Sequence, residues 1–263
     1  MLKDVSFIVT AAIEILLPII LAIIIWKKFK VSWAIFFLGM VLFLASLIRI
    51  PLNTYLGGLL QSNFRGEIFY ILYGAMAGLT AGIFEEGVRV LALGAVIKPR
   101  DYHKGVMYGI GHGGGGESMI FIGLTTLANF IIFKFFPNIL PLNIIPQIAQ
   151  MAWYMPLAGA LERILAIAIQ IAFSVLIMYA FMSRKYYMIF VTIIFHAIVD
   201  LVAFYLNYKF GFWFAEASAA VFAIIGIIII VKLKPRNGDI NKLKNDTLNS
   251  TAAKYSSSGE IEK

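Results

Sequence analysis

The sequence contains no cysteine and few charged residues. Without cysteine, the chain has no disulfide, no thiolate metal ligand and no cysteine nucleophile. Charged residues make up 14% of the 263 positions, against about 25% in an average soluble domain. The net charge of +8 comes without a basic stripe interleaved with aromatic residues, so nucleic acid is not an expected partner.

Apolar residues, in contrast, make up 61% of the chain, against about 45–50% in soluble domains. This composition predicts a multi-pass protein of the cell membrane, surrounded by the lipid bilayer. The apolar runs are continuous, whereas transmembrane β-strands alternate over about 10 residues. We therefore predict an all-α fold, a bundle of transmembrane helices.

Seven apolar segments are long enough to cross a bilayer, which takes about 20 helical residues. They cover residues 5–26, 31–50, 68–97, 105–133, 157–182, 186–206 and 212–231. Residues 134–156 contain four prolines and are predicted to form a loop with a short interfacial or re-entrant piece. We expect residues 1–231 to form one transmembrane domain and residues 232–263, rich in Ser, Asn, Thr and Lys, to be a disordered tail.

Lysine and arginine are unevenly distributed between the two sets of segment ends. One set holds Lys27, Lys28, Lys30, Lys98, Arg100, Lys104, Arg184, Lys185, Lys232, Lys234 and Arg236, and the other holds Lys3, Arg49, Arg65, Lys134 and Lys209. The richer side is expected to be cytoplasmic. This places the N-terminus outside and the tail in the cytoplasm.

Ionisable residues within membrane spans are candidates for function, because each charge near a helix centre costs about 2.5–3.5 kcal/mol on insertion scales. The spans contain Glu14, Glu85, Glu86, Arg89, His112, Glu117, Glu162, Arg163, His196 and Asp200. At about 1.5 Å per residue, Glu85, His112 and His196 lie roughly 11–18 Å from the predicted cytoplasmic end. Glu85, Glu86, His112, His196 and Asp200 are therefore expected to converge at one depth.

Two short motifs supply most of this set. In "FEEGVRV", Arg89 lies four residues after Glu85 and three after Glu86, so it shares a helix face with both acids. The pattern fits a structural ion pair, or an arginine that orients one carboxylate while the other acts as general base. In "FHAIVD", His196 and Asp200 are four residues apart. That spacing suits two ligands of one metal, an acid that orients the imidazole, or a contact between helices.

The stretch "GIGHGGGGESM" places His112 and Glu117 on either side of four consecutive glycines. The glycines permit close helix packing, or a kinked backbone that admits substrate and lets Glu117 turn toward His112. We predict the second case. Glu14 is expected to be hydrogen-bonded or protonated. Glu162 and Arg163 are expected to form a structural clamp near the outer end of their span, away from the other ionisable residues.

Taken in order, these motifs resemble those of the superfamily of CAAX prenyl proteases and bacteriocin-processing membrane proteases. "GHGGGGES", together with "EEGVR" and "HAIVD", is most similar to the YhfC branch of intramembrane metalloproteases. The resemblance covers about residues 68–206. The chain departs from the better-known EExxxR pattern by one residue, and Asp200 stands where asparagine is common.

The resemblance implies a peptidase that acts on a membrane protein or peptide. It assigns Glu85 as water activator or ligand, His112 and His196 as the two histidines, Asp200 as the residue after the last histidine, and Glu117 to the branch-specific element. It leaves open whether Glu85, His112 and His196 hold zinc, which would lower the pKa of bound water to about 7. The alternative is metal-free activation of water by Glu85 or Glu86 as general base.

Two other classes of function compete with a peptidase. Acids and histidines near the membrane midplane also occur in proton-coupled transporters, although the chain shows no internal repeat. A non-catalytic membrane scaffold or bacteriocin-immunity protein could also carry these residues. Metal content would distinguish the peptidase from the transporter.

Overall fold

The computed structural model describes residues 2–139 and 144–235, and within these ranges the chain is helical and contains no strand. The elements are α1 (Leu2–Phe29), α2 (Trp33–Ser46), α3 (Arg49–Asn63), α4 (Gly66–Leu91), η1 (Ala92–Val96), α5 (Tyr102–Gly109), η2 (Ile110–Gly123), α6 (Leu124–Phe135), η3 (Pro137–Ile139), α7 (Ile144–Gln150), α8 (Met155–Met182), α9 (Tyr187–Phe210) and α10 (Phe212–Lys232). Seven helical segments of this part are long and apolar enough to cross a membrane. The predicted all-α transmembrane bundle is thus confirmed.

Two features, the orientation of the bundle and the division into domain and tail, stay predictions. The orientation of the bundle in the membrane is not determined, so an outer N-terminus stays a prediction. Of the expected tail, residues 236–263 lie outside the described residues, and the division into a membrane domain and a tail also stays a prediction.

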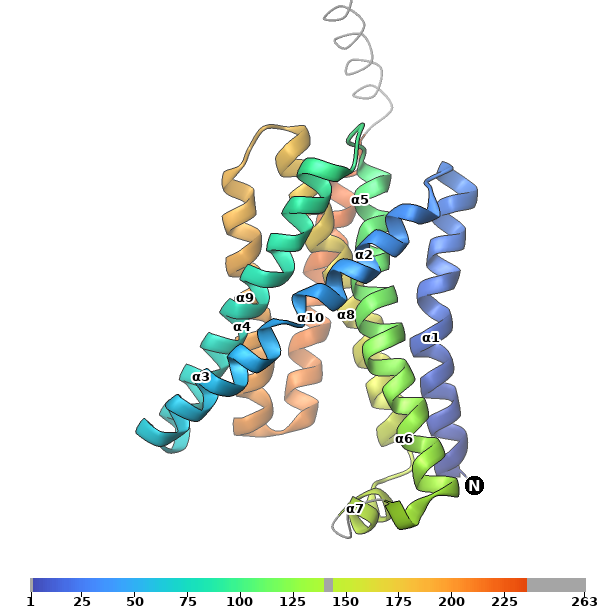
Figure 1. Cartoon of the computed structure of the whole chain (residues 1–263), viewed down its shortest axis with the longest axis vertical. Coiled ribbons are helices and arrows are strands. Elements are labelled where there is room, and N and C mark those ends of the chain that lie inside the picture. Colours follow the sequence, from blue (N-terminus) through green and yellow to red (C-terminus); the bar gives the residue numbers. More distant parts are fainter. Residues whose placement is uncertain (1, 140–143, 236–263) are drawn as a thin grey trace, which may run out of the picture.

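The second span is longer than predicted and is broken. It runs over Trp33–Asn63, and Leu47 and Ile48 separate α2 from α3. Pro51 lies in the first turn of α3, where its missing N–H costs little, although its ring would clash with the carbonyl of residue 47 in a continuous helix. In Figure 1, α2 and α3 run obliquely across the other helices. Among the described elements, α3 packs mainly against α4.

The α8 helix lies at the centre of the bundle. Most of its side chains between Ile167 and Ala180 are buried, and it contacts α1, α5, η2, α9 and α10. One apolar core joins it to α1, α2 and α5 through residues such as Ala22, Phe36 and Met107. A polar side chain on the buried part of α8 is therefore surrounded by protein rather than by lipid.

Glycines on α4 allow close contact with α9. Gly78 and Gly82 face the backbone of α9, and an added Cβ would lie 2.5 Å from the Ala197 carbonyl oxygen or 2.6 Å from that of Ile193. Small residues four apart permit such close approach between transmembrane helices. Glu85 and Glu86 lie in the second turn after Gly78, so this contact places both acids beside the middle of α9.

Candidate active site

A buried cluster of charged residues begins on α4. Glu85, Glu86 and Arg89 are almost completely inaccessible, at 2%, 0% and 0% exposure. Arg89 Nη1 donates to Glu86 Oε1, and Arg89 Nη2 lies 3.9 Å from Glu85 Oε2. One arginine thus neutralises much of the charge of two adjacent carboxylates, as the spacing of "EEGVR" predicted.

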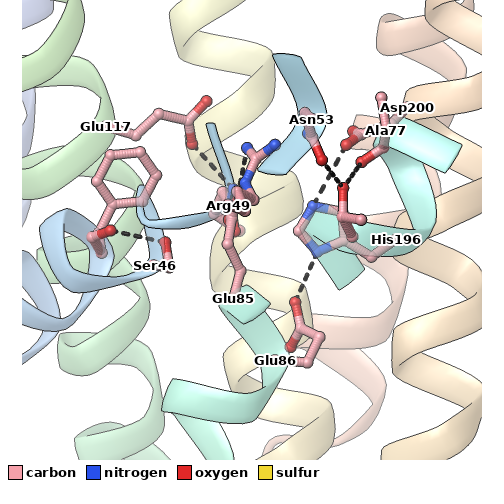
Figure 2. A network of polar contacts seen from close by, with 12 residues as sticks. Ser46, Arg49, Asn53, Ala77, Glu85, Glu86, Glu117, His196 and Asp200 are labelled. Atoms are coloured by element: carbon pink, nitrogen blue, oxygen red, sulfur yellow. Dashed lines mark hydrogen bonds and ion pairs between the residues drawn. The ribbon is translucent and has the colours of Figure 1, made fainter. Parts of the chain in front are cut away.

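His196 on α9 lies between two carboxylates (Figure 2). Its Nδ1 is 2.7 Å from Glu86 Oε1, and its Nε2 is 3.7 Å from Asp200 Oδ2. The first distance is a hydrogen bond, whereas the second is too long for one. The ring stacks on Phe173 at 4.7 Å. Glu86 and Phe173 therefore fix the imidazole so that Nε2 points toward Asp200.

His112 reaches the other acid of the pair. Its Nε2 lies 3.4 Å from Glu85 Oε2, and Phe43 packs edge-on against the ring at 5.3 Å. Arg49, the first residue of α3, donates from Nη2 to Glu85 Oε1 over 3.0 Å. The structure thus brings Glu85, Glu86, His112, His196 and Asp200 into one connected network.

Gln170 of α8 forms hydrogen bonds with three charged residues of this network. It accepts a hydrogen bond from Arg89 through Oε1. Its Nε2 donates to Glu85 Oε2 over 3.2 Å and to Glu117 Oε2 over 2.9 Å. Both amide hydrogens and the amide oxygen are therefore used, as a buried polar group requires.

Glu162 and Arg163 belong to the same network, so the expected separation from it was wrong. Arg163 Nη1 donates to Glu117 Oε1 over 2.8 Å, and Nη2 donates to Glu162. Glu117 in turn accepts from Gln170. The prediction compared backbone positions alone, whereas the long side chains of Arg163, Glu117 and Gln170 join the two groups.

The glycine stretch lies in η2, a π-helix that covers Ile110–Gly123. A π-helix bonds residue i to residue i+5, so residues five apart stack about one turn above each other. His112 and Glu117 are five apart and would diverge on a regular α-helix. The wider helix lets both turn toward α4 and α8, where they meet Glu85 and Gln170.

The glycines serve helix packing, contrary to our expectation of a kinked entrance for substrate. An added Cβ would meet Gln170 at Gly113, Pro18 at Gly114, Phe36 at Gly115 and Phe43 at Gly116. All four positions are buried. Each glycine thus faces a different part of the surrounding helices α1, α2 and α8, and its missing side chain makes room for a neighbouring residue.

A cavity of about 140 Å³ opens beside this network, and we call it the His196 cavity. Its polar lining consists of Glu117, Glu162, Arg163, Gln170, His196 and Asp200. Glu85 and Glu86 do not line it. The side chain of Asp200 is 40% exposed, against 4% for His196, so the space next to His196 Nε2 is accessible from the Asp200 side.

The arrangement does not fit the zinc site considered for Glu85, His112 and His196. Within residues 2–139 and 144–235, no three histidine or acidic residues are grouped so as to hold a metal ion. Glu85 already binds Arg49 through Oε1 and Gln170 through Oε2. A cation that binds this carboxylate would have to displace an arginine.

Sequence inspection missed two members of the network. Arg49 was counted only among the basic residues at the ends of the spans, as a marker of orientation. Gln170 was not noticed, although it is the lone polar residue in the run "ILAIAIQIAF". A polar side chain surrounded by apolar residues in a membrane span is a usable signal, since it must find a partner inside the protein.

Comparison with known proteins places the sequence of this chain in a family. Residues 13–222 match the family model described as YhfC intramembrane metalloprotease. A relative from Bacillus subtilis (strain 168), described as "Uncharacterized membrane protein YhfC", is 30% identical over 243 residues, which span 83% of this chain and 89% of the relative. No solved structure matches the chain.

Proposed function

The chain belongs to the YhfC family, and we propose that it is an intramembrane peptidase that hydrolyses a peptide bond of a membrane protein or membrane-bound peptide. The observation that supports this most directly is the position of His196. Glu86 holds its Nδ1, and its Nε2 faces a cavity. An imidazole oriented by a carboxylate is the usual arrangement of a general base.

The attacking water would lie between His196 and Asp200. The 3.7 Å between His196 Nε2 and Asp200 Oδ2 is too long for a direct hydrogen bond, and a water beside both atoms can bond to each. His196 Nε2 accepts a proton from this water, and the oxygen attacks the carbonyl carbon of the peptide. The C–N bond then breaks, and the proton passes from His196 to the departing amine.

The negative charge on the carbonyl oxygen would be stabilised by Arg163. This arginine lines the His196 cavity and uses two of its N–H groups on Glu117 and Glu162. A guanidinium has five donors, so others remain for an oxyanion. A fixed cation in a site shielded from water is an effective means of stabilising such charge.

Glu85 and His112 would stabilise the positions of the neighbouring side chains rather than act on the water, because neither residue lines the His196 cavity. This differs from the roles that the family resemblance implies, in which Glu85 activates water or binds a metal. The proposed steps therefore use His196, Asp200 and Arg163 and include no metal.

The test is peptide cleavage by the purified protein in proteoliposomes that contain a library of fluorescent single-span peptides. Products are identified by mass spectrometry. His196→Asn and Asp200→Asn should each lower the rate at least about 100-fold, the usual contribution of a general acid or base. His103→Asn is the matched control, since this histidine lies at the start of α5 and contacts Phe29 and Asp101 instead. Full activity in a folded His196→Asn protein would refute the proposal.

A proton-coupled transporter is the second candidate. It is favoured by the two adjoining cavities lined by acids, because such a path also suits proton transfer. Proteoliposomes that cleave no peptide but acidify in response to an imposed gradient, with loss of the response in Asp200→Asn, would support the transporter.

A further inference from the structure

A second cavity, of about 390 Å³, adjoins the His196 cavity, and we call it the Glu216 cavity. The two share Glu162, Asp200, Ala203 and Ala219 in their linings. At about 30 Å³ for each water in the liquid, the Glu216 cavity has room for a long side chain and several waters. It thus lies directly beside the space where the peptide bond would be cleaved.

The charges around the Glu216 cavity are predominantly negative. The charged side chains in its lining are Arg49, Glu162, Asp200 and Glu216. Arg49 is paired with Glu85, and Glu162 with Arg163. Asp200 faces His196. Of the acids in this lining, Glu216 is therefore the one that forms no ion pair with the described residues.

Glu216 is buried and incompletely partnered. It lies in the second turn of α10, with 7% exposure, and its Oε2 has no hydrogen-bond partner among residues 2–139 and 144–235. A buried carboxylate oxygen without a donor loses its hydration and gains no hydrogen bond in exchange. The side chain is therefore suited to a ligand that brings a donor and a positive charge.

The distance from His196 to Glu216 corresponds to a few peptide residues. His196, Asp200, Ala203 and Asn207 line the two cavities along one side of α9. Glu216 follows the α9–α10 turn at Gly211 by five residues, so it lies at about the level of residue 206. Ten residues of α-helix rise about 15 Å, and an extended peptide covers this distance in about four or five residues.

We propose that the Glu216 cavity binds a lysine or arginine side chain of the substrate, located within about five residues of the scissile bond, through a charge-assisted hydrogen bond to Glu216. This inference rests on the proposed peptidase function and adds the substrate class. A basic residue at one end of a transmembrane segment would then select the segment and set its register relative to His196.

The experiment uses N-acetylated single-span peptides of leucine and alanine, so that the cation is a side chain and not the amino terminus. One position, moved in turn through the five residues on either side of the centre, carries lysine, norleucine or glutamate. Binding is measured by fluorescence anisotropy to the full-length His196→Asn protein in nanodiscs, and cleavage is measured with the protein that retains His196. Both are repeated with Glu216→Gln and Glu216→Lys.

At one or two neighbouring positions, lysine should bind about 10- to 100-fold more tightly than norleucine, the range expected for a hydrogen bond between charged groups. Glu216→Gln should abolish the preference, and Glu216→Lys should reverse it in favour of glutamate. Glu216→Gln keeps the size of the side chain and removes no described hydrogen bond at Oε2, so the protein should remain folded. A merely structural role would not reverse the preference.

The outcomes separate the two proposals. Cleavage without a lysine preference, or a preference that survives Glu216→Gln, would overturn the cation site and leave the peptidase assignment intact. A lysine preference that depends on Glu216, with no cleavage of any peptide, would uphold the cation site and overturn the peptidase assignment. Equal binding of all three peptides at every position would also overturn the cation site.

Discussion

Alanine at Gly113 provides a quantitative test of the helix packing around η2. A Cβ at this position would lie 2.6 Å from Gln170 Cγ, and it would also contact Gln170 Cβ. The first distance is 0.8 Å short of the 3.4 Å at which ordinary van der Waals contact begins. Because Gln170 Cβ is attached directly to the backbone of α8, the clash cannot be relieved by the end of a flexible side chain.

The expected cost combines three effects. Overpacking of a core by one methyl group costs about 1–3 kcal/mol. A shifted Gln170 would lose at least one bond to Arg89, Glu85 or Glu117, and bonds to charged groups contribute about 1.5–3 kcal/mol each. Alanine recovers about 1 kcal/mol of helix propensity. We therefore expect Gly113→Ala to lower the free energy of unfolding by about 3 kcal/mol.

The assay is reversible unfolding in mixed micelles with increasing dodecyl sulfate, followed by tryptophan fluorescence. Gly159→Ala is the control, because an added Cβ at Gly159 of α8 has no atom within 4 Å. This control should be neutral or up to about 1 kcal/mol more stable. Equal stability of Gly113→Ala and Gly159→Ala would refute the packing role and restore the idea of an open, kinked segment.

Two further predictions concern topology and metal binding. Because the chain has no cysteine, single cysteines can be introduced and labelled from outside the cell. Ser257→Cys and Arg184→Cys should react only after the cells are permeabilised, and Ser62→Cys should react in intact cells. Labelling of Ser257→Cys in intact cells would show that the predicted orientation is reversed. The unmodified protein should retain no stoichiometric zinc in equilibrium dialysis followed by elemental analysis, because Glu85 is engaged by Arg49 and Gln170. Tight stoichiometric binding of zinc would show that these two residues do not keep a cation from Glu85.

The fold was predictable because its main determinant is hydrophobicity. Continuous apolar runs specify helices and their number, and the location of buried charge follows from its cost in lipid. The predicted ends of the membrane spans were wrong where polar residues and glycines are mixed with apolar residues. Residues 51–63, which contain Asn53, Gly57 and Gly58, were left outside the predicted spans, yet they belong to α3, because packing against α4 outweighs their weak helix propensity.

The convergence of the site residues was predictable in part. Pairs on one helix, such as Glu85 with Arg89 and His196 with Asp200, follow from the spacing of four residues. Contacts between helices depend on depth, tilt and helix type. The π-helical form of η2 could not be anticipated from a rule based on 3.6 residues per turn, so the link from Glu117 to Arg163 was missed.

This link explains how so many charges are accommodated within the membrane-spanning region. Arg49 and Arg89 compensate Glu85 and Glu86, and Arg163 compensates Glu117 and Glu162. Gln170 connects the two groups without adding charge. Since removal of one partner from a buried pair leaves the other uncompensated, a loss of any of these arginines should be far more harmful than the loss of Glu216. The network is therefore a rigid frame around His196, and Glu216 is the acid whose charge is available to a ligand.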